Sequence, residues 1–420
     1  MMQKVWVISV SMGYGHQRTA YPLKDLAPEG EVINANAYQG IPQRDRKIWE
    51  GMRMFYEFIS RLKRLPLIGE TAFAAYDKFQ KILSFYPKRD LSEPNLQLKQ
   101  IFSLIKKGWG GHLIERFKQK SLPLISTFFI PAFMAEYLNY PGKIYCIICD
   151  ADISRTWVSF NPSQSKIKYF APTRRVTERL KLYGVKPENI YLTGYPLPLE
   201  LLGSENLEIL KNDLLNRILN LDPKGRYRHY YEPLIKKYLG DLPQKSNHPL
   251  TIMFAVGGAG AQKEIGTQIV KSLKNKIKNG EVKIILAAGI KEKVKKYFKK
   301  NIGNLNGVEI IFGRDINDYF QKFNQALRKT DVLWTKPSEL SFYAALGLPI
   351  IIAPPIGSQE DFNKRWLLKS GFGNFQENPN LAHQWLFDWL DGGYLAEAAM
   401  QGFIEGEKLG AFNIQKIISK

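Results

Sequence analysis

Residues 5–20 read VWVISVSMGYGHQRTA, an apolar run that ends in a glycine turn and continues into a polar segment. We expect a strand over 5–10, a turn at Gly13 and Gly15, and a helix that begins near His16. Glycine lets the backbone pass close to a ligand, and the amino end of a helix favours anionic groups. His16 would therefore stand at the mouth of a ligand site, as a base or a phosphate contact.

The same pattern opens the second half of the chain, where residues 251–270 read TIMFAVGGAGAQKEIGTQIV. The GGAGA loop at 257–261 joins an expected strand to an expected helix, and its backbone amides could cradle a diphosphate. Two such loops predict that both face one inter-domain site. The alternative is that each glycine only allows tight packing of a strand on its helix.

A third segment, residues 331–373, predicts strand, loop, helix, strand, loop and helix in turn. Ser338 is a candidate N-cap, and Glu339 falls in the first helical turn. Gln359, Glu360 and Asn363 follow an apolar strand and the bend APPIG, so we expect them at the carboxyl end of a strand. Side chains of this type bind hydroxyl-rich ligands such as sugars.

Short β-rich runs alternate with helical patterns along most of the chain, which predicts parallel sheets covered by helices. At 420 residues, two domains are expected. We predict an α/β protein with two Rossmann-like domains whose sheets face a cleft. The expected strands are 5–10, 32–34, 124–129, 144–149, 168–170, 190–193, 252–255, 283–287, 308–312, 332–334 and 349–353.

The formal net charge of +21 indicates a polyanionic partner, either nucleic acid or an anionic membrane. The sequence contains no helix-turn-helix, zinc module or RNA-binding aromatic motif, so specific nucleic-acid recognition is not expected. It has no apolar run of the ~18 residues that would span a bilayer, and nothing that resembles a signal peptide. A cytoplasmic protein is expected.

The region 44–120 contains 17 Lys or Arg against 8 Asp or Glu, interleaved with aromatic residues. Its stretch 49–64, WEGMRMFYEFISRLKR, predicts a basic amphipathic helix with an aromatic edge, which suits a membrane surface. A helix packed on its own domain would carry the same stripe. A second basic block at 271–300 has 11 lysines and 2 glutamates, and there a solvated face is expected. The candidate membrane contacts are Trp49, Arg53, Tyr56, Arg61 and Arg64.

Cys146 and Cys149 form a Cys-x-x-Cys pair inside an apolar run. Such a pair can be a redox or metal half-site, but no second pair or histidine cluster completes a zinc site. We expect buried, reduced thiols.

Five segments in order resemble glycosyltransferase family 28, which includes monogalactosyldiacylglycerol synthase and the peptidoglycan lipid-linked N-acetylglucosaminyltransferase. SMGYGHQRTA (11–20) resembles the family's glycine loop, and GGAGAQ (257–262) resembles its donor-diphosphate loop. CDADISRTW (149–157) and the stretch 167–196 are similar to the diacylglycerol-sugar synthases. LGLPIIIAPPIGSQEDFN (346–363) resembles the segment that holds the donor sugar.

The resemblance implies a GT-B fold and inverting transfer of a hexose from a UDP-sugar to a lipid acceptor, without a metal or cofactor. It implies a peripheral enzyme of glycolipid biosynthesis on the inner face of the membrane. Inversion needs one base and positive dipoles for the departing diphosphate. The implied roles are His16 and Asp150 in catalysis, Gly13, Tyr14 and Gly15 as acceptor loop, Gly257, Gly258 and Gly260 on the diphosphate, and Gln359, Glu360 and Asn363 on the donor sugar.

The implied domains are an acceptor domain at 1–198, with the basic insertion at about 44–120, and a donor domain at 250–395. A helical linker at 199–249 would join them, and a terminal helix at 396–420 would pack back on the first domain. Sugar, acceptor and oligomeric state stay open.

This sequence departs from the family at two positions. Phe342 stands where the family has a Glu that grips the ribose, and Glu339, one turn earlier, could replace it. Tyr14 stands where many members have glycine, and it could narrow the acceptor channel. Two alternatives therefore remain: a nucleotide-sugar 2-epimerase with the same fold, which would leave the basic insertion unexplained, and a non-catalytic GT-B binding protein.

Overall fold

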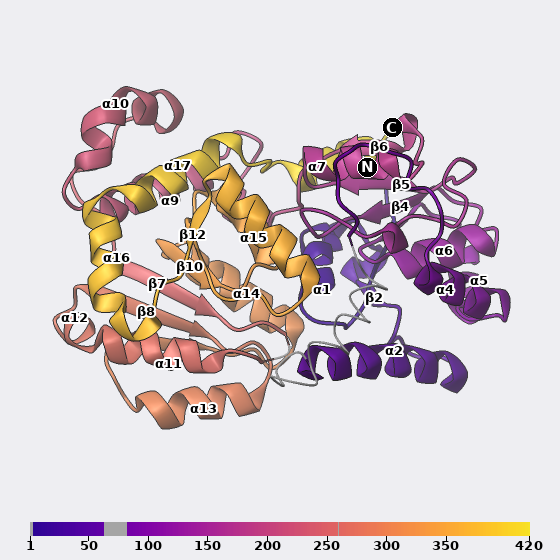
Figure 1. Ribbon diagram of the computed structural model, residues 1–420, viewed down its shortest axis with the longest axis horizontal. Helices are drawn as coiled ribbons and strands as arrows, with labels where there is room; N and C mark the ends of the chain where they lie inside the picture. Colours follow the sequence, from indigo (N-terminus) through magenta and orange to yellow (C-terminus); the bar gives the residue numbers. More distant parts are fainter. Residues whose placement is uncertain (1–2, 63–81, 259) are drawn as a thin grey trace. The chain divides into compact units, whose positions relative to one another are not determined.

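A computed structural model describes residues 3–62, 82–258 and 260–420, without the side chains of residues 55–62 and 358. The chain divides into two compact units (Figure 1). The first comprises Met1–Pro196, Ile356–Phe362 and Leu409–Lys420. The second comprises Leu197–Pro355 and Asn363–Lys408.

The first unit is built on a six-stranded parallel sheet in the order β2-β1-β3-β4-β5-β6. β2 lies on one side of β1, and β3 and the later strands lie on the other side. The order in which strands are added to the sheet therefore switches sides between β1 and β3. Ligands of such sheets bind at the carboxyl ends of the strands beside this switch point. The strands are β1 (Trp6–Ser9), β2 (Ile33–Asn34), β3 (Leu124–Ser126), β4 (Ile144–Ile147), β5 (Lys168–Ala171) and β6 (Ile190–Leu192).

The second unit also contains six parallel strands, in the order β12-β11-β10-β7-β8-β9. Numbered from β7, this is the order 3-2-1-4-5-6 of a Rossmann fold, with its switch point between β7 and β10. The strands are β7 (Leu250–Ala255), β8 (Val282–Ala287), β9 (Val308–Ile311), β10 (Val332–Thr335), β11 (Ile350–Ile352) and β12 (Gly373–Phe375).

These two sheets confirm the predicted α/β class with two Rossmann-like domains. The central strands are almost wholly buried, as apolar runs covered on both faces should be. The eleven expected strands are all present with shorter or shifted ends. The sequence pattern did not predict β12. This strand begins with Gly373, contains no β-branched residue and is only three residues long, so it cannot be told from a loop.

Helices connect the strands, and in Figure 1 those of the second unit flank its sheet. The first unit contains α1 (Gly15–Ala20), η1 (Tyr21–Leu26), η2 (Pro28–Gly30), α2 (Gln43–Leu62), α4 (Leu96–Lys106), α5 (Gly111–Lys118), α6 (Phe129–Tyr137), η3 (Arg155–Trp157), α7 (Arg174–Leu182), η4 (Pro187–Asn189) and α18 (Gly410–Ile418). The second unit contains α8 (Leu199–Leu202), α9 (Glu208–Leu221), α10 (Arg226–Leu239), α11 (Lys263–Ser272), α12 (Lys274–Lys278), α13 (Glu292–Ile302), α14 (Ile316–Leu327), η5 (Glu339–Leu346), η6 (Pro379–Leu381), α16 (Ala382–Asp391) and α17 (Tyr394–Glu405). One further helix, α15 (Ser358–Ser370), has its first residues in the first unit and the rest in the second.

Three local features differ from the sequence expectations. The helix after the first glycine loop, α1, has only six residues before a 3₁₀ turn, so its dipole is small. Ser338 precedes a 3₁₀ helix, and its side chain makes no capping hydrogen bond. The expected linker 199–249 contains α8, α9 and α10 of the second unit, and only α18 of the expected terminal segment belongs to the first unit.

Within the described ranges, every helix is either too short or too polar to cross a lipid bilayer.

Candidate functional site

His16 lies at the switch point of the first sheet, where the loops after β1 and β3 meet. Its Nδ1 is 2.8 Å from the carbonyl oxygen of Thr127, the residue that follows β3. A carbonyl oxygen can only accept a hydrogen bond, so Nδ1 carries the hydrogen. In the neutral ring Nε2 then holds the lone pair, and it is the nitrogen that can take up a proton.

Aromatic and sulfur groups hold the imidazole of His16 in place. The Phe128 ring meets it edge-on at 4.7 Å between centroids, and Trp157 lies at 6.2 Å. The Sγ atom of Cys149 is 3.4 Å from Nδ1. Asp150 follows Cys149 beyond the carboxyl end of β4 and is half-buried. The structure thus brings the chain segment of Asp150 next to His16.

The cysteine prediction is confirmed, since both thiols are buried and form no disulfide. Burial raises the pKa of the Cys146 thiol well above its ordinary value. Sequence reasoning missed that Cys149 adjoins the imidazole, because the contact joins two strands far apart in the chain.

The loop between β1 and α1 has the backbone conformation that its glycine predicted. Gly13 has a φ of +96°, which disfavours residues with a side chain. Tyr14 is the N-cap of α1 and is only 8% exposed. The Ser11 amide donates to Asn36 Oδ1 at 2.9 Å, which fixes this loop to the end of β2.

A pocket of about 260 Å³ adjoins the β1–α1 loop in the first unit. It lies between that loop, the end of β2 and one face of α2, so the basic helix forms a wall of it. Its lining residues are Ser11, Asn36, Ala37, Arg46, Trp49, Glu50 and Arg53. A larger pocket of about 680 Å³ in the same unit contains none of the predicted site residues.

The expectation that Trp49 contacts a membrane is wrong. Its side chain is 3% exposed, and it packs edge-to-face on Trp109 at 4.8 Å and near Phe128 at 6.4 Å. The amphipathic stripe of α2 therefore packs at this position on the core of its own unit. Arg53 is exposed. The side chains of Tyr56 and Arg61, and the whole of Arg64, lie outside the described residues.

The glycine loop of the second unit lies at its switch point, between the ends of β7 and β10. Lys336 follows β10, and its side chain crosses directly over Gly257. A Cβ atom on Gly257 would lie 2.4 Å from Lys336 Cε and 3.5 Å from Nζ. A side chain at this position would therefore displace the end of the lysine from the loop. The arrangement holds an ammonium group beside the loop amides, as a diphosphate requires.

Further contacts shape the loop. The Gly260 amide donates to the Gly257 carbonyl at 2.7 Å, which closes a tight turn around Gly258. Gln262 has a left-handed φ of +63°, and its Nε2 donates to the Pro354 carbonyl at 2.8 Å. The loop that follows β7 is therefore tied to the loop that follows β11.

Glu339 and Phe342 share one face of η5. In a 3₁₀ helix residues three apart eclipse each other, so Glu339 reaches the side on which Phe342 stands. Both are buried, at 8% and 4% exposure, and Phe342 packs on Trp366 at 5.1 Å. Glu339 and Phe342 thus lie on the same side of η5, and the ribose role of Glu339 stays a prediction.

The polar residues of α15 separate into two groups. Gln359 and Glu360 lie in the segment Ile356–Phe362 of the first unit, and Glu360 Oε2 accepts from the Ile356 amide at 2.7 Å. Asn363 lies in the second unit, is fully buried, and donates to the Pro337 carbonyl at 3.3 Å. Asn363 thus supports the loop that carries Lys336.

Sequence reasoning missed Lys336 and Thr127. Lys336 lies in the segment 331–373 but has no distinctive pattern around it, and Thr127 follows a strand that carries no motif. Their signal is their place after β10 and β3, which only the strand order reveals. Among the described residues no group of three or more His, Cys, Asp or Glu side chains is arranged to hold a metal ion.

Comparison with known proteins finds similarity over most of the chain. The processive diacylglycerol beta-glucosyltransferase of Bacillus subtilis (strain 168) is 22% identical over 315 residues, which cover 73% of this chain and 71% of the relative. The enzyme of the same name from Bacillus licheniformis is 20% identical over 306 residues, covering 71% and 68%. A family model described as "Domain of unknown function (DUF6938)" matches residues 243–326.

Solved structures give weaker likenesses. MurG from Acinetobacter baumannii aligns with a TM-score of 0.46 and 12% identity over 99% of both chains. UDP-GlcNAc 2-epimerase from Neisseria meningitidis, bound to UDP-GlcNAc, aligns with a TM-score of 0.48 and 13% identity, covering 78% of this chain and 82% of that one.

Proposed function

We propose that this chain is a GT-B glycosyltransferase that moves a hexose from a UDP-sugar to a lipid acceptor, with inversion and without a metal. The observation that carries the proposal is Lys336 held over Gly257 at the switch point of the second unit. A cation beside the amides of a glycine loop is suited to the diphosphate of a nucleotide-sugar. Similarity to the diacylglycerol glucosyltransferases supports a sugar donor and a lipid acceptor.

In the proposed reaction the acceptor hydroxyl oxygen attacks the anomeric carbon while the bond from that carbon to the diphosphate oxygen breaks. The hydroxyl proton passes to Nε2 of His16, and UDP leaves with the bonding electrons. Thr127 keeps the hydrogen of His16 on Nδ1, so that Nε2 is ready to accept. Lys336 and the amides of Gly257 and Gly258 stabilise the charge that develops on the leaving group.

The acceptor is proposed to enter the first unit, with its hydroxyl end in the 260 Å³ pocket beside the β1–α1 loop. Ser11, Asn36 and Arg46 supply hydrogen-bonding groups there. Since α2 forms a wall of this pocket and exposes Arg53, we propose that its basic side faces an anionic membrane from which the lipid enters. The enzyme would work peripherally on the cytoplasmic side.

The direct test combines the purified protein with UDP-glucose and vesicles that contain diacylglycerol, and follows UDP release and glycolipid formation. Glycolipid with inverted anomeric configuration, formed equally well with a chelator present, is the expected result. Conversion of UDP-N-acetylglucosamine to its 2-epimer without acceptor would favour the epimerase instead. If no UDP ligand raises the unfolding temperature, the chain has no donor site. That result would favour the non-catalytic binding protein.

Replacing Lys336 by methionine is expected to weaken UDP binding about 10- to 100-fold. Hydrogen bonds to charged groups contribute ~1.5–3 kcal/mol, and ~1.4 kcal/mol corresponds to tenfold in affinity. Titration calorimetry with UDP measures the change. Lys245→Met, an exposed lysine of the same unit, is the matched control and should bind UDP normally. Equal affinity in both variants would remove Lys336 from the donor site.

Replacing Glu339 by glutamine is expected to weaken UDP binding about tenfold, because a carboxylate binds the ribose hydroxyls more strongly than an amide does. Binding of uracil and inorganic diphosphate as separate ligands should change little. Thermal unfolding without ligand checks that the buried site is intact. UDP affinity within twofold of the wild type would show that Glu339 does not replace the family's ribose residue at Phe342.

A further inference from the structure

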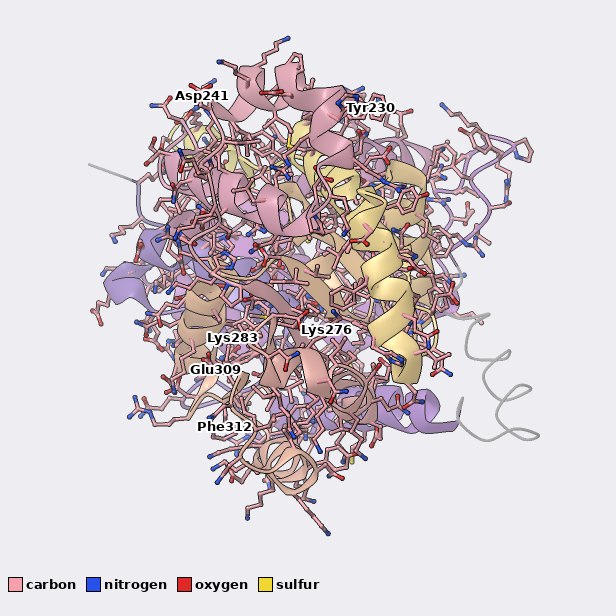
Figure 2. All side chains as sticks on the ribbon, turned by 90° about the vertical axis from the view of Figure 1, so that its left-hand side faces the viewer. Tyr230, Asp241, Lys276, Lys283, Glu309 and Phe312 are labelled. Carbon is pink, nitrogen blue, oxygen red and sulfur yellow. The ribbon has the colours of Figure 1, made fainter. Side chains whose placement is uncertain are left out.

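Helix α13 of the second unit carries a dense row of lysines on its outer side. Val294 and Phe298 are buried and attach the helix to its sheet. Lys293, Lys296, Lys299 and Lys300 are exposed, and no acidic side chain among the described residues lies within ion-pair distance of them. In Figure 2 α13 lies at the bottom, below the labelled Phe312, with nitrogen-tipped side chains radiating from it. We call these four residues the α13 lysine face.

Neighbouring lysines of the same basic block have partners inside the fold. Lys295 lies 4.3 Å from the Phe312 ring centroid, and Lys276 pairs with Glu281 at 3.0 Å. Lys283 pairs with Glu309 at 3.1 Å (Figure 2). Lys271, Lys274 and Lys278 of the block are exposed as well, but they lie on α11 and α12, so the α13 lysine face is the part of the solvated face that a single helix presents.

Helix stability does not explain this row. Positions three and four apart are neighbours, so Lys296 faces like charges at Lys293, Lys299 and Lys300, and each such pair costs ~0.2–0.5 kcal/mol. Lys293 stands in the first turn, where the helix dipole disfavours cations. An anionic surface that covers the face would offset this self-repulsion.

We propose that the α13 lysine face docks on the anionic surface of a lipid bilayer. Lysine is depleted in the cores of protein interfaces, which argues against a protein partner. Recognition of a nucleic acid would use arginines and stacking aromatics, and this face has neither. Each lysine gains ~1 kcal/mol near an anionic bilayer, because the attraction is to the negative potential of the whole surface.

Docking through α13 would bring the donor loop to the membrane. A Cβ on Gly260 would lie 3.1 Å from Val294 Cγ2 and 3.3 Å from Lys291 Cδ, so the start of α13 rests against the loop. The eleven residues of α13 span only ~16 Å. A docked α13 therefore holds the glycine loop within about one helix length of the lipid headgroups. The choice of lipid as partner rests on the proposed function.

The test is cosedimentation with vesicles of phosphatidylcholine alone and of phosphatidylcholine mixed with phosphatidylglycerol. The variant K293Q/K296Q/K300Q is expected to partition to the mixed vesicles about 100-fold more weakly than the wild type, from ~1 kcal/mol per lysine. The control K245Q/K329Q/K369Q removes the same charge from exposed lysines on other elements of the unit and should lose at most about threefold. Both variants should keep the thermal shift with UDP.

An equal loss in both variants would overturn the proposal, because the attraction would then be diffuse. Unchanged vesicle binding by K293Q/K296Q/K300Q would overturn it as well. So would a loss confined to binding of a labelled oligonucleotide, which would assign the face to nucleic acid. Vesicle binding needs no turnover, so the α13 result stands even where the transfer assay shows no glycolipid.

Discussion

Replacing His16 by alanine is expected to lower kcat for sugar transfer about 100- to 10,000-fold, the range that a positioned general base contributes. The Thr127 carbonyl takes the hydrogen of Nδ1, so the neutral ring presents Nε2 as a base. No other histidine shares the carboxyl-end loops of β1, β3 and β4 among the described residues. Transfer rates with saturating UDP-sugar and acceptor measure the change.

Two controls separate catalysis from folding and donor binding. UDP affinity of His16→Ala should match the wild type, because the change lies outside the unit that carries the glycine loop. His229→Ala, an exposed histidine on α10, should transfer sugar normally. A kcat for His16→Ala within threefold of the wild type would rule out His16 as the base.

The sequence motifs located the two ligand loops because each is a local pattern. A buried strand followed by glycines identifies a βα turn, and the structure places both turns at switch points. What the motifs could not show is which other loop lies beside each turn. Thr127 and Lys336 are 111 and 79 residues from His16 and Gly257, and only the strand order brings them together.

The same limit explains the error at Trp49. An amphipathic stripe shows that one side of a helix is apolar, but it does not show whether core or lipid covers that side. In α2 the stripe meets Trp109 and Phe128 at this point. For α13 the informative residues are instead the charged ones. Which of them has a partner depends on residues such as Phe312, which lies beside Lys295 and which periodicity does not reveal.

Replacing Asp331 by asparagine is expected to make the protein more stable than the wild type at pH 8. Asp331 lies just before β10, at the amino end of the strands and opposite the end that carries the glycine loop. It is fully buried. Its Oδ2 accepts from the Thr251 amide at 2.8 Å and from Asn220 Nδ2 at 2.9 Å. Its Oδ1 has no hydrogen-bond partner among the described residues. Burial raises the pKa of this carboxyl to about 8.

The sign of the pH dependence follows from the two states. Between the ordinary pKa of 3.8 and about 8, the folded protein holds the Asp331 proton and the unfolded chain does not. The unfolding free energy therefore falls as pH rises, at ~1.4 kcal/mol per unit, or about 2 kcal/mol between pH 6 and 8. His248 Nδ1 lies 3.6 Å away, and burial lowers the pKa of that imidazole. Its contribution to the pH dependence has the opposite sign, and since the imidazole contacts Asp331 its pKa is measured in both wild type and variant.

Denaturant unfolding of wild type and Asp331→Asn across this pH range measures the effect of the carboxyl once the titration of His248 in each protein is known. Asparagine is neutral at every pH and keeps an oxygen for Thr251 and Asn220. Asp331→Leu is also neutral but leaves both donors without their acceptor, so it should be less stable than Asp331→Asn by ~1–3 kcal/mol at all pH values. A wild-type curve that stays parallel to both variants would mean that Asp331 is ionised in the folded state. The buried Arg217, whose positive charge acts on this carboxyl, would then form an ion pair with it.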